Sequence, residues 1–371
     1  MKPTYKPHID GLRALAVVVV ILYHCELKFS GRSLFGGGFV GVEVFFVISG
    51  YLITLSILSQ LYSNTFNLRG FYEKRARRIL PALYLTILLS LIVAKFTLAK
   101  ESMSDFAKSS LFAIGFNSNW WFVSNGSYVD PPTPTHPLLH TWTLSVEEQY
   151  YLLFPILVLS IWKLKPSWTL PIVALLCSFS FLTANIGINF FPPENYYLFP
   201  SRAWEILCGS LLAIKESNSV VKKRPPFGDF LPVVGLIFII YAVFAFSDQT
   251  PHPSSFTLLP IVGSMLVIRY FQPSSIGALL LNNAFVVFIG KISYSLYLLH
   301  YPILAFAKYQ NGPLTTFQKI GCCVASVAAS IIFYFYIEQP FRDHEAIPKK
   351  MFLKVAGMLT FFLLLLSWTF L

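Results

Sequence analysis

Charged residues are scarce in this chain of 371 residues: Asp, Glu, Lys and Arg make up 12% of it, whereas soluble domains carry roughly 25%. That shortage excludes a soluble globular enzyme. Cysteine is scarce too, and the spacing lacks the C-x-x-C pattern of a metal or redox site, so no metal is expected. The five cysteines, which we expect to be small core residues of apolar runs, are Cys25, Cys177, Cys208, Cys322 and Cys323.

Acidic residues are fewer than basic ones, 17 against 28, which gives a formal net charge of +11. A positive charge can attract nucleic acid, but in a membrane protein basic loops are the expected mark of the cytoplasmic side. We therefore expect the lipid bilayer, and no nucleic acid, around this chain.

The sequence contains many long apolar runs. Hydrophobic residues make up 55% of the chain. Their runs recur at about 17 to 22 residues, the length that a helix needs to cross the hydrocarbon. The pattern predicts an all-α integral membrane bundle with eleven crossings. The predicted spans are 11–28, 39–59, 80–99, 145–162, 170–188, 199–214, 230–246, 256–271, 284–305, 317–337 and 351–371.

Loop charges predict the orientation of the bundle. The first run lacks a small-residue cleavage pattern, so we expect a retained helix with a cytoplasmic amino end. The predicted inner loops 60–79, 163–169 and 215–229 then hold the Lys and Arg residues, and the carboxyl end lies on the periplasmic side. Within 100–144, the run LFAIGFNSNWWF is apolar enough to form a re-entrant or interfacial helix.

An ionisable side chain inside an apolar run is costly and therefore marks a candidate site. Arg13 and His24 lie eleven residues apart, which turns a helix by about 1100° and advances it by about 16 Å, so the two share one face. Asp10 is predicted to cap this helix. The spacing suits a long substrate with an anion at the cytoplasmic rim and a reacting atom deeper. Alternatively, Arg13 only reaches the interface and His24 is a satisfied core residue.

Glycines mark the second run, at 36–38, 41 and 50. They allow close approach of a neighbouring helix or of a ligand, and helix packing is the preferred interpretation. Glu43 lies near the outer end of this run. Ser49 lies deeper and is a candidate to bind an acceptor or relay a proton.

A cluster of cations follows in FYEKRARRILP, residues 71–81. In a helix, Arg75 and Arg78 would lie on one side, and Lys74 would stack with Arg78. Anchoring at the cytoplasmic surface explains the cluster without a ligand. The more specific hypothesis is that Arg75 and Arg77 bind a phosphate group.

The segment HPLLHTWTLSVEEQYYLLFP, residues 136–155, contains two adjacent acids. Ser145 and Glu148 fit a capping box that would begin the fourth span. Glu147 has no such role, and with His140 just before it we take it as a candidate for binding or proton transfer.

Later spans carry three further polar patterns. Arg202 and Glu205 are predicted to form an ion pair. Ser293, Tyr297 and His300 form one polar stripe, which is either an internal hydrogen-bond seam or part of a site. Glu338 precedes Pro340, and it either pairs with Arg342 or orients an arginine from elsewhere.

Seven segments, in order from about residue 8 to residue 342, together resemble acyltransferase family 3, the bacterial membrane O-acyltransferases that acetylate lipopolysaccharide O-antigen and related glycans. They are IDGLRALAVVVVILYH, FVGVEVFFVISGYLIT, FYEKRARRILP, PLLHTWTLSVEEQYYLLFP, SRAWEILCGSLLA, GKISYSLYLLHYP and YIEQPFR.

The resemblance implies roles for particular residues. Arg13 and His24 match the family's Arg-x10-His motif, and Arg75 and Arg77 match its Arg-x-Arg motif, both associated with the use of cytoplasmic acetyl-CoA. Glu338 matches the acidic residue of the tenth-span motif. We predict catalytic roles for His24, Glu147 and Glu338, acetyl-CoA binding by Arg13, Arg75 and Arg77, and acceptor or relay roles for His140, Ser49, Tyr297 and His300.

The run HTWTLSVEEQ resembles the subgroup in which an eleventh helix leads to a periplasmic SGNH-type domain. This implies a membrane acyltransferase domain of ten helices over 1–345 and an eleventh helix within 346–371, in the bacterial inner membrane. The SGNH-type domain would be fused or separate.

The hypothesis that follows is transfer of an acyl group, expected to be acetyl, from acetyl-CoA across the inner membrane to a hydroxyl of a glycan or lipid-linked glycan. The phosphates would lie on Arg75, Arg77 and Arg13. His24 would either deprotonate the acceptor or carry the acetyl group. The alternative is a transporter or flippase for a lipid-linked glycan or small solute, although no inverted repeats are visible.

Overall fold

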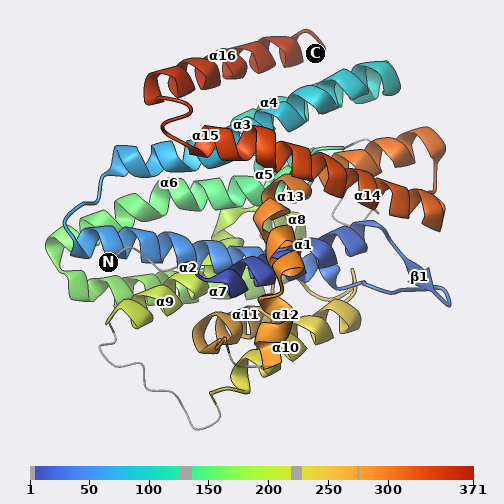
Figure 1. Ribbon diagram of the computed structural model, residues 1–371. Coiled ribbons are helices and arrows are strands. Elements are labelled where there is room, and N and C mark those ends of the chain that lie inside the picture. The colour runs from blue at the N-terminus through green and yellow to red at the C-terminus, as the bar shows by residue number, and fades with distance from the viewer. Residues whose placement is uncertain (1–4, 126–135, 219–227, 274–275) are drawn as a thin grey trace. The chain divides into compact units, whose positions relative to one another are not determined.

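A computed structural model describes residues 5–125, 136–218, 228–273 and 276–371. The chain divides into two compact units, each described below by itself. Unit 1 comprises Met1–Phe66 and Val146–Lys291, and unit 2 comprises Asn67–Ser145 and Ile292–Leu371. Two of the three boundaries fall inside long helices, α6 (Thr141–Leu164) and α13 (Ala284–Asn311). Helices dominate the described residues in Figure 1.

Eight helical segments in the described part of the chain are long and apolar enough to cross a membrane. They are Pro7–His24, Gly38–Tyr62, Leu68–Thr97, Thr141–Leu164, Pro166–Phe190, Ala284–Asn311, Thr316–Arg342 and Lys349–Trp368. Two shorter apolar helices span Leu231–Ala245 and Ser255–Tyr270, and the helix Phe199–Asn218 carries buried charges. These segments correspond in order to the eleven predicted spans, so the all-α membrane fold is confirmed.

Unit 1 begins with α1 (Pro7–His24), a hairpin of β1 (Lys28–Phe29) and β2 (Arg32–Ser33), and the turn η1 (Gly38–Val40), which leads into α2 (Gly41–Tyr62). After α6 come η2 (Pro166–Trp168), α7 (Thr169–Phe190), α8 (Pro192–Tyr197), α9 (Phe199–Asn218), α10 (Leu231–Ala245), η3 (Ser255–Thr257), α11 (Leu258–Tyr270) and α12 (Ile276–Leu281). Within this unit α9 packs against both α2 and α7, and α10 packs against α11.

Glycines let the helices of unit 1 approach backbone to backbone. A Cβ atom on Gly50 of α2 would lie 1.8 Å from the carbonyl oxygen of Ile206 in α9, and one on Gly209 would lie 2.0 Å from that of Val47. Gly41 approaches the backbone of α1 in the same way. The helix-packing interpretation of the second run is therefore confirmed.

Unit 2 contains α3 (Leu68–Thr97), α4 (Lys100–Ile114), α5 (Ser118–Asn125), α14 (Thr316–Phe333), the π-helical turn η4 (Tyr334–Glu338), α15 (Gln339–Arg342) and α16 (Lys349–Trp368). Figure 1 shows α3, α4 and α16 side by side, and all three are in contact. The hydroxyl of Thr360 in α16 donates to the hydroxyl of Tyr84 in α3 at 2.9 Å. The last predicted span is thus a helix that packs on α3.

The predicted limits of the first span are wrong at both ends. The helix begins at Pro7, whose fixed φ suits the first helical turn, so Asp10 lies within that turn instead of capping the helix. It ends at His24, four residues before the predicted limit. The next turn contains Glu26 with a φ of 48°, which a right-handed helix cannot accommodate.

The predicted capping box at Ser145 and Glu148 is also wrong. The helix α6 already begins at Thr141, so Ser145 lies inside it. The Ser145 hydroxyl donates to the carbonyl oxygen of Thr141 at 3.2 Å and accepts from the backbone N–H of Ser118 at 3.1 Å. Ser145, which lies four residues after the start of α6, therefore connects α6 to α5 and does not cap the helix.

The basic segment within the predicted inner loop 60–79 is helical, which is the case in which Arg75 and Arg78 lie on one side. It belongs to the 30-residue helix α3, which Asn67 caps by accepting from the N–H of Arg69. Within the described part of the segment 100–144, α4 and α5 are shorter than the roughly 20 residues of a crossing, so neither is a candidate span. Residues 219–227 of the predicted loop 215–229 lie outside the described residues.

Candidate functional site

The two central candidates, Arg13 and His24, lie on the uninterrupted helix α1. Arg13 is in its second turn and His24 is its last residue, and both side chains are half-buried. Arg13 Nη1 donates to Asp10 Oδ1 at 3.2 Å. Because α1 is continuous, the predicted rise of about 16 Å and the shared face both hold. The chemical roles of the two side chains stay predictions.

The end of α1 that carries His24 is attached to the segment after α10. The Tyr23 hydroxyl donates to Asp248 Oδ1 at 2.8 Å. The Tyr23 ring lies 5.2 Å from the His24 imidazole and meets the Phe39 ring edge-on. These contacts hold the helix end in place and so limit where the imidazole can lie.

Two more candidates, Ser49 and Glu147, are brought together in unit 1. The Ser49 hydroxyl donates to Glu147 Oε1 at 2.8 Å, and the Tyr151 hydroxyl donates to Oε2 at 3.1 Å. Hydroxyl donors stabilise the ionised form of a carboxylate and fix its direction. The arrangement suits a carboxylate that accepts a proton or holds a polar group.

Arg202 forms the centre of a fully buried cluster in unit 1. Its Nη1 atom lies 3.0 Å from Glu205 Oε1, which confirms the predicted pair, and 3.1 Å from Glu43 Oε1. The same Nη1 atom lies 2.9 Å from His252 Nε2, which is in turn 2.9 Å from Glu43 Oε1. The backbone carbonyl of Tyr196 accepts from Arg202 Nε at 2.8 Å.

Burial, and then the charge of Arg202, lower the pKa of His252 below its usual value. Glu43 and His252 were missed as members of this cluster. No spacing rule could reveal them, because Glu43 lies 159 residues from its partner Arg202. A paired, enclosed group of this kind fits a structural role better than a binding role.

A second network in unit 1 was not predicted. The Tyr51 hydroxyl accepts from Lys6 Nζ at 2.6 Å and donates to Glu216 Oε2 at 2.8 Å. Arg269 Nη1 donates to Glu216 Oε1 at 3.1 Å. Together these contacts join α1, α2, α9 and α11.

In unit 2, the Arg77 guanidinium is enclosed by protein groups. It is 1% exposed. Its Nε atom donates to Glu73 Oε1 at 3.1 Å, and Nη1 donates to the carbonyl oxygens of Phe341 and Ile347 at 3.3 and 2.8 Å. The guanidinium also lies 4.7 Å from the centre of the Phe352 ring. These contacts connect α3 to the segment 341–352. The phosphate role of Arg77 stays a prediction.

Glu73 also connects α3 to α16, because Lys349 Nζ lies 2.8 Å from its Oε2 atom. Arg75 and Arg78 are half-buried and lie on a different side of α3 from Arg77. The predicted pair of phosphate ligands is therefore divided between two faces of one helix.

Glu338 is buried and accepts from Arg342, as one of the two predicted alternatives requires, and also from the Ser295 hydroxyl. Its carboxylate thus joins the end of η4 to α13 and fixes Arg342 of α15.

The remaining candidates, His140, Tyr297 and His300, form a buried aromatic cluster in unit 2. The His140 ring lies 5.5 Å from the Tyr297 ring and 5.8 Å from the His300 ring. The Tyr297 hydroxyl lies 2.7 Å from Thr143 Oγ1. Burial lowers the pKa of His140 well below its usual value, so its imidazole is neutral near pH 7.

Within the described ranges, no group of three or more His, Cys, Asp or Glu side chains is placed to hold a metal ion.

An all-α, multi-pass chain with a half-buried imidazole and a half-buried guanidinium on one helix defines a membrane-embedded protein with candidate transfer chemistry. The model of the acyltransferase domain family matches residues 7–335. The chain therefore belongs to acyltransferase family 3.

The alignments with two named relatives cover most of this chain. O-acetyltransferase OatA of Staphylococcus aureus strain NCTC 8325 is 32% identical over 372 residues, which cover 94% of this chain and 60% of the relative. A putative O-acetyltransferase of Staphylococcus aureus strain MSSA476 is 31% identical over 356 residues, with 92% and 58% covered. The chain thus spans about 60% of the length of the curated relatives it matches. No solved structure matches significantly.

Proposed function

We propose that this chain is the membrane part of an O-acetyltransferase, which moves an acetyl group from acetyl-CoA to a hydroxyl of a cell-surface glycan. Membership of acyltransferase family 3 and the names of the O-acetyltransferase relatives support the reaction type. The observation that carries the proposal is the pair Arg13 and His24 on one continuous, half-buried face of α1.

The length of that face suits coenzyme A. Its phosphates and its thioester are separated by the pantetheine arm, which is comparable with the rise of about 16 Å from Arg13 to His24. A guanidinium binds phosphate through parallel N–H donors, and a neutral imidazole accepts a proton near pH 7. Arg13, Arg75 and Arg77 are the proposed phosphate ligands.

The reaction balances with His24 as the general base. The imidazole takes the proton of the acceptor hydroxyl while the hydroxyl oxygen bonds to the thioester carbonyl carbon. The carbon–sulfur bond breaks, and the thiolate of coenzyme A receives the proton from the imidazolium. In the covalent variant the acetyl group bonds first to the imidazole and then to the acceptor.

Other residues are assigned supporting roles in this proposal. Glu147, held by Ser49 and Tyr151, is a second candidate proton acceptor. Glu338 is assigned an indirect role, in which its carboxylate holds the Arg342 guanidinium in place. The candidates for the acceptor side or a relay are His140, Tyr297 and His300.

The setting proposed for this reaction is the bacterial inner membrane, with lipopolysaccharide O-antigen or a lipid-linked glycan as the candidate acceptor. A periplasmic SGNH-type domain, fused or separate, is the proposed partner.

An assay in proteoliposomes separates this proposal from a transporter or flippase. Purified chain is given acetyl-CoA labelled in the acetyl group, and free coenzyme A thiol and labelled product are measured over time. The proposal predicts thiol release that requires the protein. Movement of a lipid-linked glycan across the bilayer without any cleavage of acetyl-CoA would contradict it and favour the transporter.

A further inference from the structure

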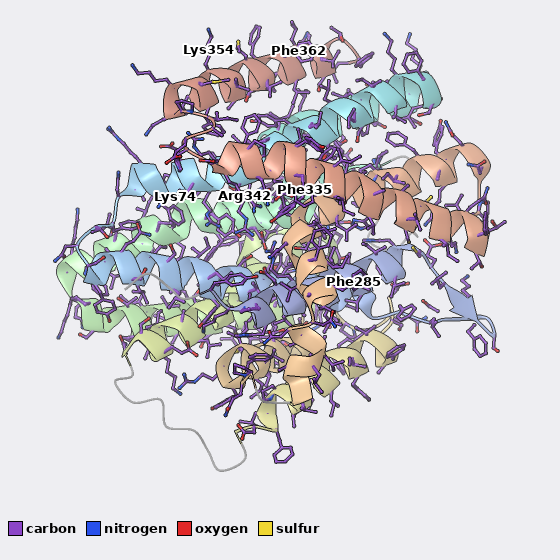
Figure 2. All side chains as sticks on the ribbon, in the orientation of Figure 1. Lys74, Phe285, Phe335, Arg342, Lys354 and Phe362 are labelled. Atoms are coloured by element: carbon purple, nitrogen blue, oxygen red, sulfur yellow. The ribbon has the colours of Figure 1, made fainter. Side chains whose placement is uncertain are left out.

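Two cysteines of unit 1 that lie 31 residues apart in the sequence meet in the structure. Cys177 of α7 and Cys208 of α9 are both free thiols, and their Sγ atoms lie 3.8 Å apart. No spacing rule along the chain predicts this pair, because the two residues lie on different helices. Figure 2 shows the side chains of these helices, with sulfur atoms in yellow.

Contacts one helical turn away hold the two thiols next to each other. The backbone N–H of Trp204 donates to Ser180 Oγ at 2.9 Å, and the Ser180 hydroxyl donates to the carbonyl oxygen of Pro200 at 2.5 Å. Ser180 lies three residues after Cys177, and Trp204 lies four residues before Cys208, so the two antiparallel helices meet at successive turns. Cys177 Sγ also lies 3.6 Å from the carbonyl oxygen of Trp204.

A close helix contact fixes α9 from its other side. Within unit 1, α9 packs against both α2 and α7. A Cβ atom on Gly209, the residue after Cys208, would lie 2.0 Å from the carbonyl oxygen of Val47 in α2. Because α2 blocks movement of α9 away from α7, the adjacent position of the two sulfur atoms is a fixed feature of the unit.

The thiol pair lies at a depth that apolar molecules reach. Cys177 and Cys208 lie near the middle of α7 and α9, which correspond to two of the predicted spans. Cys177 is buried and Cys208 is half-buried. Their neighbours Leu175 and Phe179 on α7 are large, apolar and exposed, as the lipid-facing side of a membrane helix requires. Charged molecules are costly at such a depth, so an oxidant that reaches the pair must dissolve in lipid.

We propose that Cys177 and Cys208 are a reversible redox site, in which a lipid-soluble quinone oxidises the two thiols to a disulfide. Each thiol gives up one proton and one electron, and one bond forms between the sulfur atoms. The quinone takes up the two electrons and the two protons and leaves as the hydroquinone. Rotation about the side-chain bonds shortens the distance between the sulfur atoms from 3.8 Å to the bond length of about 2.05 Å.

The disulfide would join α7 to the helix that carries the buried arginine of unit 1. Arg202 and Glu205 lie on α9 within two turns before Cys208. A disulfide restricts the unfolded chain, here across 31 residues, so it stabilises the folded state. The thermal unfolding temperature of the oxidised chain should therefore be higher by about 5 °C or more.

Thiol counting on the purified full chain in nanodiscs tests this site. The reduced chain is incubated with decylubiquinone or with glutathione disulfide, and the remaining thiols are alkylated after unfolding and counted by mass spectrometry. The quinone is expected to remove two of the five thiols and to link the peptides that contain Cys177 and Cys208. Glutathione disulfide, which is charged, should react about tenfold more slowly or less. Dithiothreitol should restore both thiols and the lower unfolding temperature.

Matched variants make the thiol count specific. Cys177→Ser and Cys208→Ser should each keep all of their remaining thiols in the presence of the quinone. Cys322→Ala and Cys323→Ala leave the pair intact and should lose two thiols like the wild type. Neighbouring residues on a helix point about 100° apart, so Cys322 and Cys323 are not expected to bridge. Where a serine variant fails to fold, the linked peptide of the wild type still identifies the bridge.

The proposal is overturned if the quinone leaves all five thiols open to alkylation, if the bridge joins other cysteines, or if glutathione disulfide reacts as fast as the quinone. A bridge between Cys177 and Cys208 that leaves the unfolding temperature unchanged would contradict the stabilising connection of α7 to α9. No step of acetyl transfer enters these measurements, so their outcome is independent of the proposed function.

Discussion

Two arginines of this chain differ in how far they are enclosed. In unit 1, Arg202 is fully buried with two carboxylates and an imidazole around it. In unit 2, Arg75 is half-buried on α3, and it is one of the proposed phosphate ligands.

The difference separates a buried structural cluster from a candidate binding residue. The cluster around Arg202 joins α2, α9 and the segment before η3, and its charges are paired with one another inside the unit. A half-buried guanidinium can still bind an anion from outside. Arg202 and Arg75 are both ionisable residues in an apolar chain, so the location of such residues alone does not tell the two roles apart.

The largest effect is expected when the unit 1 cluster is broken. Arg202→Met removes the buried cation and leaves Glu43 and Glu205 uncompensated, which should lower the free energy of unfolding by about 3–5 kcal/mol. Thermal unfolding in detergent measures this. Glu205→Gln keeps the Glu43–Arg202 pair and should cost clearly less. Equal unfolding temperatures for Arg202→Met and the wild type would contradict a structural role.

The helix contact beneath this cluster should be the next most sensitive. Gly50→Ala places a Cβ atom 1.8 Å from the carbonyl oxygen of Ile206, so α2 and α9, which carry Glu43 and Arg202, must separate. Overpacking of this kind costs about 1–3 kcal/mol. Gly357→Ala in α16 meets nothing within 4 Å and serves as the control. If both variants unfold at the same temperature, the close contact of α2 and α9 is not what holds the cluster.

Arg75 in unit 2 should respond in binding and not in folding. Arg75→Ala removes one phosphate donor, so the Kd for coenzyme A should rise about tenfold, or about 1.4 kcal/mol. The loss should shrink at high salt, because partly exposed charges are screened. Calorimetry at two salt concentrations measures both effects. Unchanged affinity, or a large loss of thermal stability instead, would place Arg75 with the structural cluster.

The smallest effect is expected at the carboxylate of Glu147. Ser49→Ala and Tyr151→Phe each remove one hydrogen bond to it, worth about 1 kcal/mol, so each should change the acetyl transfer rate only several-fold. The double variant should lose more than either single variant because both donors hold one group. A rate equal to that of the wild type in the double variant would remove Glu147 from the reaction.

Much of the fold was predictable, because a crossing needs a long apolar run and eleven such runs are visible. Helix ends were less predictable. Pro7 begins α1 before Asp10, and α6 begins before Ser145, so the local capping patterns pointed to residues inside the helices.

The candidate site was predictable only where partners share a helix. Arg202 and Glu205 lie three apart, and Arg13 and His24 lie eleven apart, so helical periodicity relates each pair. Arg77 and the carbonyl of Ile347 lie 270 residues apart, and Ser49 and Glu147 lie 98 apart. Such contacts depend on how helices pack, which leaves no periodic pattern along the chain.

The central claim, that His24 performs acetyl transfer, is tested most directly by His24→Ala in the proteoliposome assay. The substitution should abolish release of coenzyme A thiol and labelled product, while the Kd for coenzyme A and the unfolding temperature stay near the wild-type values. His344→Ala, a change at an exposed histidine, should retain activity. Acetyl transfer by His24→Ala at close to the wild-type rate would contradict the account.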